Sequence, residues 1–155
     1  VVNAIAFTRG VAKVTLLRVP DQPGVASGIF KPLADAGVNV DMIVQNIAAD
    51  GKATDITFTV GKADLKKSLD TLAKVDALKN VKIVTADNVA KVSVVGIGMT
   101  SYHGVASKMF ETLAAKSINI QVITTSEIKI SVLIEEDYVE LAVRALHAAY
   151  GLEAA

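Results

Sequence analysis

The sequence predicts an α+β fold made of two copies of one β-α-β-β-α unit, with a further strand at the start of the chain. Three observations predict this fold. Similar segments recur in the same order in the two halves of the 155 residues. Within each half, apolar residues follow first strand and then helix spacing. Gly, Pro, Asn and Asp mark the turns between these segments.

Four pairs of similar segments define the internal repeat. They are residues 12–17 with 90–95, 24–27 with 104–107, 36–40 with 116–120 and 56–60 with 130–134. The pairs keep their order, and the spacing between partners drifts only slightly, as small loop insertions would produce. Self-similarity of this kind indicates one structural unit used twice.

The first repeat contains four predicted strands and two predicted helices. β-Branched and apolar runs predict the strands, over 13–19, 39–48, 54–60 and 81–85. The first helix follows Pro23-Gly24, and Gly37 is a typical residue at its C-terminal end. Leu65, Leu69 and Leu72 have the spacing of a second helix.

The second repeat is predicted to lack its last strand. Its elements are strands over 90–97, 118–125 and 127–134 and helices over 105–116 and 136–149. A spare strand over residues 2–8 precedes the first repeat. Because an unfilled sheet edge exposes unpaired backbone groups, we expect this strand to complete the second repeat. Each unit is then a ferredoxin-like β-α-β-β-α-β domain, one formed by 12–87 and inserted into the other, formed by 1–11 plus 88–155.

Composition excludes several functional classes. Sixteen Lys and Arg balance sixteen Asp and Glu, so the basic excess that favours nucleic-acid binding is missing. The apolar runs are too short for a membrane span of about 20 residues. With no cysteine and only His103 and His147 as histidines, we expect no metal, no cofactor and no thiol nucleophile. A cytoplasmic chain fits the lack of cysteine.

The loop before the first helix of the first repeat is the best candidate for ligand binding. Gly24 lets the backbone approach a ligand closely. The N–H groups of the first helical turn favour a carboxylate, and Asp21 can receive an ammonium group. Together these groups suit an amino-acid zwitterion. The alternative is that Asp21 is an ordinary turn or cap residue.

Other polar residues support two interpretations each. Asn39 and Asn119 open corresponding second strands, and each can hold an amine or be a turn residue. Gln45 lies in an otherwise apolar strand, which favours a polar site or an interface. Residues 124–127 offer hydroxyls and a carboxylate, or form a solvated hairpin connection.

Five segments together resemble the regulatory region of aspartate kinase. They are Asp21-Gln22-Pro23-Gly24-Val25-Ala26 and residues 39–46, 54–58, 91–99 and 126–132. The resemblance covers essentially the whole chain. It implies two ACT domains of β-α-β-β-α-β fold, in agreement with the repeat, and no amino-terminal kinase domain. The chain therefore resembles either the small β subunit of an α2β2 enzyme or an excised regulatory region.

The resemblance also implies a function. Aspartate kinase uses ATP to phosphorylate the aspartate β-carboxylate, and this chain would bind threonine, lysine or both for feedback inhibition. The implied partners are a second copy of the chain and the catalytic subunit or domain of the kinase, with no nucleic acid and no membrane. The alternative is a stand-alone ACT-type amino-acid sensor or a structural dimerisation subunit.

The effector site implied by the resemblance lies where the first ACT domain of one chain faces the second ACT domain of its partner. The first part of the site would comprise Asp21, Gly24, Ala26, Asn39, Val40, Asp41 and Gln45. The facing part would comprise Val105, Ala106, Asn119, Ile120, Ser126 and Glu127. Related sequences often have Thr at the position of Ala106, so a hydroxyl contact is missing, which weakens the lysine assignment more than the threonine one. A longer Tyr102-His103 loop is a second departure.

Overall fold

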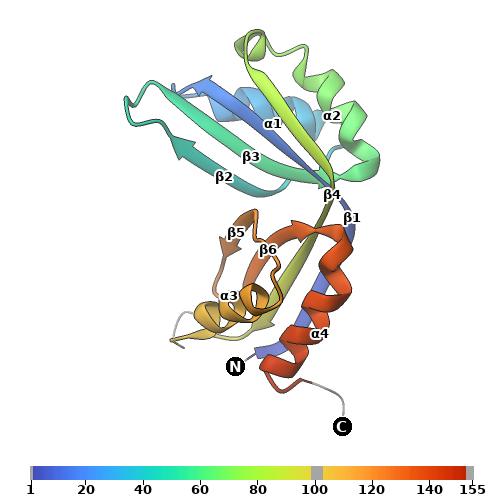
Figure 1. Ribbon diagram of the computed structural model, residues 1–155. Helices are drawn as coiled ribbons and strands as arrows, with labels where there is room; N and C mark the ends of the chain where they lie inside the picture. The colour runs from blue at the N-terminus through green and yellow to red at the C-terminus, as the bar shows by residue number, and fades with distance from the viewer. Residues whose placement is uncertain (1, 99–102, 153–155) are drawn as a thin grey trace. The chain divides into compact units, whose positions relative to one another are not determined.

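The computed structural model describes residues 2–98 and 103–152 (Figure 1). The first half of the chain forms β1 (Val2–Pro20), α1 (Val25–Asp35), β2 (Asp41–Ile47), β3 (Ala53–Gly61), α2 (Leu65–Leu72) and β4 (Lys82–Gly96). The second half forms α3 (Val105–Ala115), β5 (Val122–Thr125), β6 (Lys129–Glu135) and α4 (Val139–Ala149). With β4 counted also as the first strand of the second half, both halves follow the order β-α-β-β-α.

The chain divides into two compact units. One is Gly10–Asp87, and the other combines Val1–Arg9 with Asn88–Ala155. Hydrogen-bonded strands follow the order β2-β3-β1-β4-β6-β5, so the Gly10–Asp87 unit has the order β2-β3-β1-β4 and the other has β1-β4-β6-β5. The N-terminal part of β1 lies beside β4 and completes the second repeat. This confirms the α+β fold with one ferredoxin-like unit inserted into the other.

Strands β1 and β4 are longer than the sequence predicts. The predicted strands 2–8 and 13–19 are one strand, β1, and 81–85 and 90–97 are one strand, β4. Each of them contributes to both units, so strand conformation continues through segments that were predicted to be connections. Gly10 lies within β1 with a φ of 69°, which glycine adopts without strain.

Strands β2 and β5 begin later than predicted. Residues 39–40 and 118–121 of the predicted strands lie outside them, because this part of the chain first closes the preceding helix. The N–H of Val38 donates to the carbonyl of Leu33 at 2.9 Å, and the N–H of Ile118 donates to that of Leu113 at 3.0 Å.

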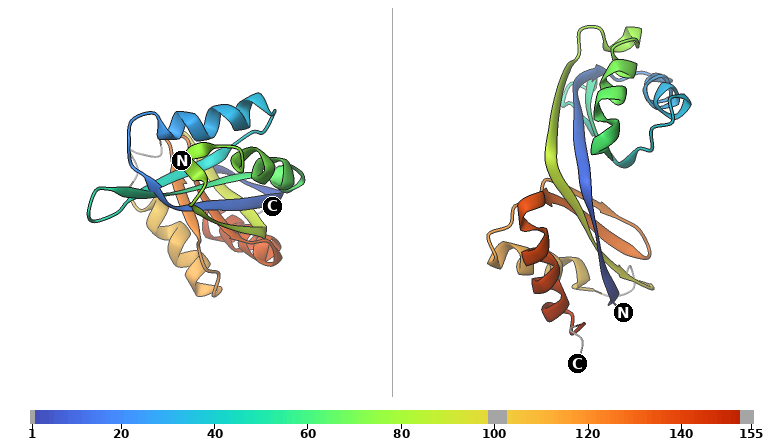
Figure 2. Two further views of the ribbon diagram at one scale, coloured as in Figure 1. Left: turned by 90° about the horizontal axis from the view of Figure 1, so that it is seen from above. Right: turned by 90° about the vertical axis from the view of Figure 1, so that its right-hand side faces the viewer.

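The core of the Gly10–Asp87 unit lies between its sheet and helices α1 and α2, which cover one face of the sheet (Figure 2). Ile29 and Leu33 of α1 are fully buried against Leu16 and Phe58 of the sheet. The rings of Phe30 and Phe58 meet edge to face, with centroids 5.3 Å apart. Each such buried side chain stabilises the fold by about 1.5–3 kcal/mol.

The unit that contains α3 and α4 has a corresponding core and one further stabilising hydrogen bond. Met109 and Leu113 of α3 pack with Val132 of β6 and Leu146 of α4. The hydroxyl of Tyr150, which follows α4, donates to the carbonyl of Val105 at the start of α3, at 2.6 Å. Burial raises the pKa of Tyr150 to about 12. This bond joins the end of α4 to the beginning of α3.

Within residues 2–98 and 103–152, no helix is long and apolar enough to cross a membrane. The same residues contain no group of three or more His, Cys, Asp or Glu that could hold a metal ion.

Candidate functional site

A hollow of about 450 Å³ opens beside the β1–α1 loop of the Gly10–Asp87 unit. The loop and the first turn of α1 form one wall, and β2 and β3 form the other. The lining residues are Pro20, Asp21, Gln22, Pro23, Gly24, Val25, Ala26, Gln45, Thr54 and Ile56.

The N-terminus of α1 supplies hydrogen-bond donors to this hollow. Gly24 is the N-cap residue, with φ 88° and ψ −10°, and no side chain among the described residues caps the helix. The N–H of Val25 donates to the carbonyl of Gln22 at 3.2 Å. Within the described part of the chain, the N–H groups of Ala26 and Ser27 have no acceptor. Such donors at a helix start bind an anion, because the helix dipole adds to their partial positive charge.

Thr54 lines the hollow and has a buried hydroxyl without a hydrogen-bond partner among the described residues. Its side chain is only 2% exposed, and its Oγ1 has no hydrogen-bond partner among the described residues. A buried polar group left without a partner costs about 1–3 kcal/mol. A polar ligand in the hollow would supply the missing partner and offset this cost.

Gln45 and Thr54 lie on the same face of the sheet. Gln45 is opposite Ile56 in the β2–β3 pair, and directly opposite residues share a face. Thr54 is two residues from Ile56, so it shares that face as well. Since Ile56 belongs to the core beneath the helices, all three side chains lie on the helix-covered face.

Asp21 brings the one negative charge among the lining residues. Its N–H donates to the carbonyl of Lys52 at 3.1 Å, which fixes the loop against the β2–β3 hairpin. Its carboxylate contacts no partner in the described residues. The hollow thus combines N–H donors, one carboxylate, the side-chain amides of Gln22 and Gln45 and one buried hydroxyl. These groups complement a small molecule with both an anionic and a cationic group.

Four of the sequence-predicted site residues line this hollow: Asp21, Gly24, Ala26 and Gln45. The other three predicted in this repeat do not line it. Asn39 is exposed and Val40 packs against the core. The carboxylate of Asp41 accepts a hydrogen bond from the N–H of Met42 at 2.8 Å.

The facing set of predicted residues lies in the other unit. Val105 and Ala106 begin α3, whose N-cap Gly104 has φ 87° and repeats the geometry of Gly24. Asn119 is exposed and Ile120 packs against the core. Ser126 accepts hydrogen bonds from two N–H groups of its own turn, and Glu127 is exposed. A role for these six residues in the effector site of a partner chain stays a prediction. Tyr102, of the predicted longer loop, lies outside the described residues.

Comparison with known proteins identifies the family. Sequence profiles of the ACT domain match residues 13–77 and 92–150. The regulatory subunit of aspartate kinase from Thermus thermophilus, solved in a ligand-free form, is 38% identical with a TM-score of 0.88, over 96% of this chain and 98% of that one. This chain belongs to the aspartate kinase regulatory family.

Two further relatives define the extent of the match. A structure of aspartokinase alpha and beta subunits contains a chain that is 48% identical, with a TM-score of 0.88 over 97% of this chain and 99% of that one. The aspartokinase of Pseudomonas aeruginosa is 55% identical over 155 residues, which are 99% of this chain and 37% of that protein. The chain therefore spans about a third of the curated aspartokinases that it matches.

The two ACT repeats differ at the polar positions of the hollow. Leu16 is opposite Ile56 in the first ACT repeat, as Val94 is opposite Ile130 in the second. With these pairs equated, the position of Thr54 is taken by Ile128, which is 54% exposed. The position of Gln45 is taken by Thr125, which is opposite Ile130. The buried hydroxyl is therefore a feature of the first ACT repeat.

Sequence reasoning missed Thr54 as a site residue. Thr54 begins the predicted strand over residues 54–60, and Thr is common in strands, so its residue type alone does not indicate a site. The available signal was its position two residues before Ile56, on a face that is otherwise apolar. The hollow is also lined by five further residues that are not among the predicted site residues: Pro20, Gln22, Pro23, Val25 and Ile56.

Proposed function

We propose that this chain is the effector-binding region of an aspartate kinase and that it binds threonine in the hollow of its first ACT domain. One observation supports this proposal most strongly. Ala26 with its unpartnered N–H, Asp21 with its carboxylate and Thr54 with its buried hydroxyl all line one hollow. Each group of a threonine zwitterion finds a complement there.

Each part of the ligand has a partner of matching chemistry. The carboxylate binds the N–H groups of Ala26 and Ser27, and the ammonium group binds Asp21. The hydroxyl of the ligand exchanges hydrogen bonds with Thr54 and Gln45, while its methyl group packs on Ile56. Charge-assisted hydrogen bonds of this kind are worth about 1.5–3 kcal/mol each.

The charge of the hollow favours threonine over lysine. Lysine brings a second ammonium group, and Asp21 is the one acidic residue among the lining residues. A second cation without a carboxylate would lose its hydration without compensation. Lysine binding is therefore the second candidate, and it requires acidic groups from outside this hollow.

The complete site is proposed to form in a homodimer. Residues Val105, Ala106, Asn119, Ile120, Ser126 and Glu127 of the second ACT domain would face the hollow of the partner chain. The ACT domains would then comprise 12–87 and 1–11 plus 88–155. Feedback inhibition requires coupling to a catalytic kinase subunit or domain in the cytoplasm, because this chain is proposed to carry the regulatory part alone.

Calorimetric titration of the chain with L-threonine, L-lysine and L-valine tests the proposal. Valine has nearly the shape of threonine but lacks the hydroxyl. We expect threonine to bind and valine to bind at least about tenfold more weakly, since a lost hydrogen bond to a buried group leaves that group unpaired. Equal affinities for threonine and valine would contradict the assignment of Thr54, and no heat with any ligand would contradict the proposed function.

A further inference from the structure

The end of β1 contains a β-bulge directly before the effector loop. Leu16 is opposite Ile56, and the next regular pair is Val19 with Thr54. Two residues of β1, Leu17 and Arg18, therefore lie opposite the single residue Asp55. A bulge of this kind bends the strand and redirects the side chains that follow it.

Arg18 has an unfavourable backbone conformation at this bulge. Its φ is 56°, in the left-handed region that residues with a side chain rarely adopt. Such a conformation persists only where neighbouring groups hold it in place, and it is typical of functional sites.

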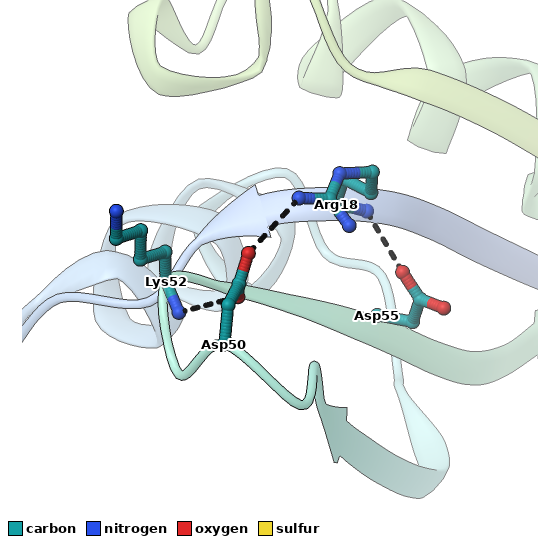
Figure 3. Close-up of polar contacts among 4 residues, drawn as sticks. All are labelled: Arg18, Asp50, Lys52 and Asp55. Atoms are coloured by element: carbon teal, nitrogen blue, oxygen red, sulfur yellow. Dashed lines mark hydrogen bonds and ion pairs between the residues drawn. The ribbon is translucent and has the colours of Figure 1, made fainter.

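Three contacts hold Arg18 and the adjoining hairpin (Figure 3). The N–H of Arg18 donates to the carboxylate of Asp55 at 2.8 Å. The guanidinium of Arg18 lies 3.8 Å from the carboxylate of Asp50. Asp50 in turn accepts a hydrogen bond from the N–H of Lys52 at 2.9 Å. The carbonyl of Lys52 accepts the hydrogen bond from the N–H of Asp21, so the contacts lead into the effector loop.

The bulge decides which residues face the hollow. In a regular strand, residues 16 and 18 share one face, so Arg18 would point into the core. With the extra residue, Val19 takes that place and is fully buried, opposite Thr54. A shift of one residue reverses the faces of every residue that follows. The loop with Asp21 therefore reaches the hollow through this bulge.

In the described part of the second ACT repeat, both the bulge and the carboxylate are absent. Val95 is regularly paired with Lys129, which stands at the position of Asp55. The next residue, Gly96, continues with a hydrogen bond from its N–H to the carbonyl of Ile128 at 2.7 Å. The bulge and the carboxylate of Asp55 therefore occur in the same repeat as the polar hollow.

We infer that Asp55 is a positioning residue for effector binding: its carboxylate holds Arg18 in the left-handed conformation and thereby places the Asp21 loop over the hollow. The inference rests on the proposed function. When the N–H of Arg18 loses the Asp55 carboxylate as its acceptor, fewer molecules hold the loop in the binding-competent conformation, and the apparent affinity falls by the same fraction.

Rescue by glycine separates positioning from a general loss of stability. Asp55→Ala should weaken threonine binding about tenfold and speed hydrogen exchange of the Asp21 amide, since the loop is released. Arg18→Gly added to Asp55→Ala should restore both measurements to near the wild-type values, because glycine adopts a positive φ without an acceptor. Should Asp55→Ala fail to fold, Asp55→Asn, which keeps an oxygen but not the charge, takes its place with a smaller expected loss.

Asp50→Asn is the matched control. The ion pair between Arg18 and Asp50 is exposed on both sides and contributes little to holding Arg18. Asp50→Asn removes this ion pair but keeps an acceptor for the N–H of Lys52, so we expect wild-type affinity. The inference is overturned if Asp55→Ala leaves either threonine affinity or exchange of the Asp21 amide unchanged. It is also overturned if adding Arg18→Gly to Asp55→Ala restores neither measurement, or if Asp50→Asn weakens binding as much as Asp55→Ala does. Absence of threonine binding by the wild-type chain would instead contradict the proposed function, while amide exchange still tests the role of Asp55.

Discussion

At the scale of single residues, Thr54 is the most informative position in the chain. The residue lines the hollow, and its hydroxyl is buried and has no partner in the described residues. A group of this kind destabilises the free protein and stabilises a complex in which the ligand supplies the partner. The unpartnered hydroxyl therefore lowers the stability of the free protein but strengthens ligand binding. A substitution can separate these two effects.

Thr54→Val should preserve or raise the stability of the free protein and weaken threonine binding. The valine side chain has nearly the same shape and removes the unpartnered oxygen. We expect the melting temperature to stay constant or to rise by a few degrees, since about 1–3 kcal/mol is associated with such a group. Threonine binding should weaken about tenfold or more. Thermal unfolding and calorimetry give the two values, and a clear loss of stability would show that the hydroxyl has an internal partner.

Asp21→Ala should weaken threonine binding about ten- to a hundredfold, because the ammonium group of the ligand loses its charged acceptor. The fold should persist, since the tie from this loop to Lys52 uses the backbone N–H of residue 21. In a holoenzyme with the catalytic part, this variant should resist feedback inhibition and keep its catalytic rate. Retention of inhibition at wild-type threonine concentrations would contradict the role of Asp21.

At the scale of elements, the two ACT repeats use the same strand–loop–helix junction with different chemistry. Gly24 and Gly104 have nearly equal φ values and both lack a side-chain cap. The carbonyl of Val105, however, accepts a hydrogen bond from Tyr150, whereas the loop of the first repeat is fixed through Lys52. The sequence could not predict this difference, because Tyr150 and Val105 are distant in the chain.

Tyr150→Phe should destabilise the second ACT domain by about 1 kcal/mol at neutral pH. The wild-type phenol has a pKa raised from 10.0 to about 12. Between these values the unfolded chain loses its proton first, so the contribution is present below pH 10 and is lost as pH rises toward 12. The gap in melting temperature between wild type and variant should therefore narrow from pH 9 to pH 11.5. A gap that does not change with pH would contradict the raised pKa.

At the scale of the whole molecule, the repeat and its inserted topology followed from the sequence. The spare strand at residues 2–8 and the missing last strand together predicted that β1 completes the second repeat. The continuity of β1 through Gly10 was not predictable, because glycine more often ends a strand. The hollow was located through Pro23-Gly24 and Asp21, but Thr54 and the bulge at Arg18 required three-dimensional pairing to be recognised.

Deletion of residues 1–8 should destabilise the second ACT domain rather than remove a loose end. Val2 and Ile5 pack against its core, and the edge of β4 would lose its hydrogen-bonded neighbour. We expect a fall of several degrees in melting temperature and greater aggregation. A truncated chain with an unchanged melting temperature would contradict the inserted topology.

The central claim is that threonine binds in the hollow of the first ACT domain. Backbone amide chemical shifts of the ¹⁵N-labelled chain, recorded during a threonine titration, test it most directly. The account predicts the largest changes at Ala26 and Ser27, whose N–H groups gain a carboxylate, together with changes at Asp21 and Gln45. Changes that leave these residues unaffected and gather elsewhere in the chain would contradict it.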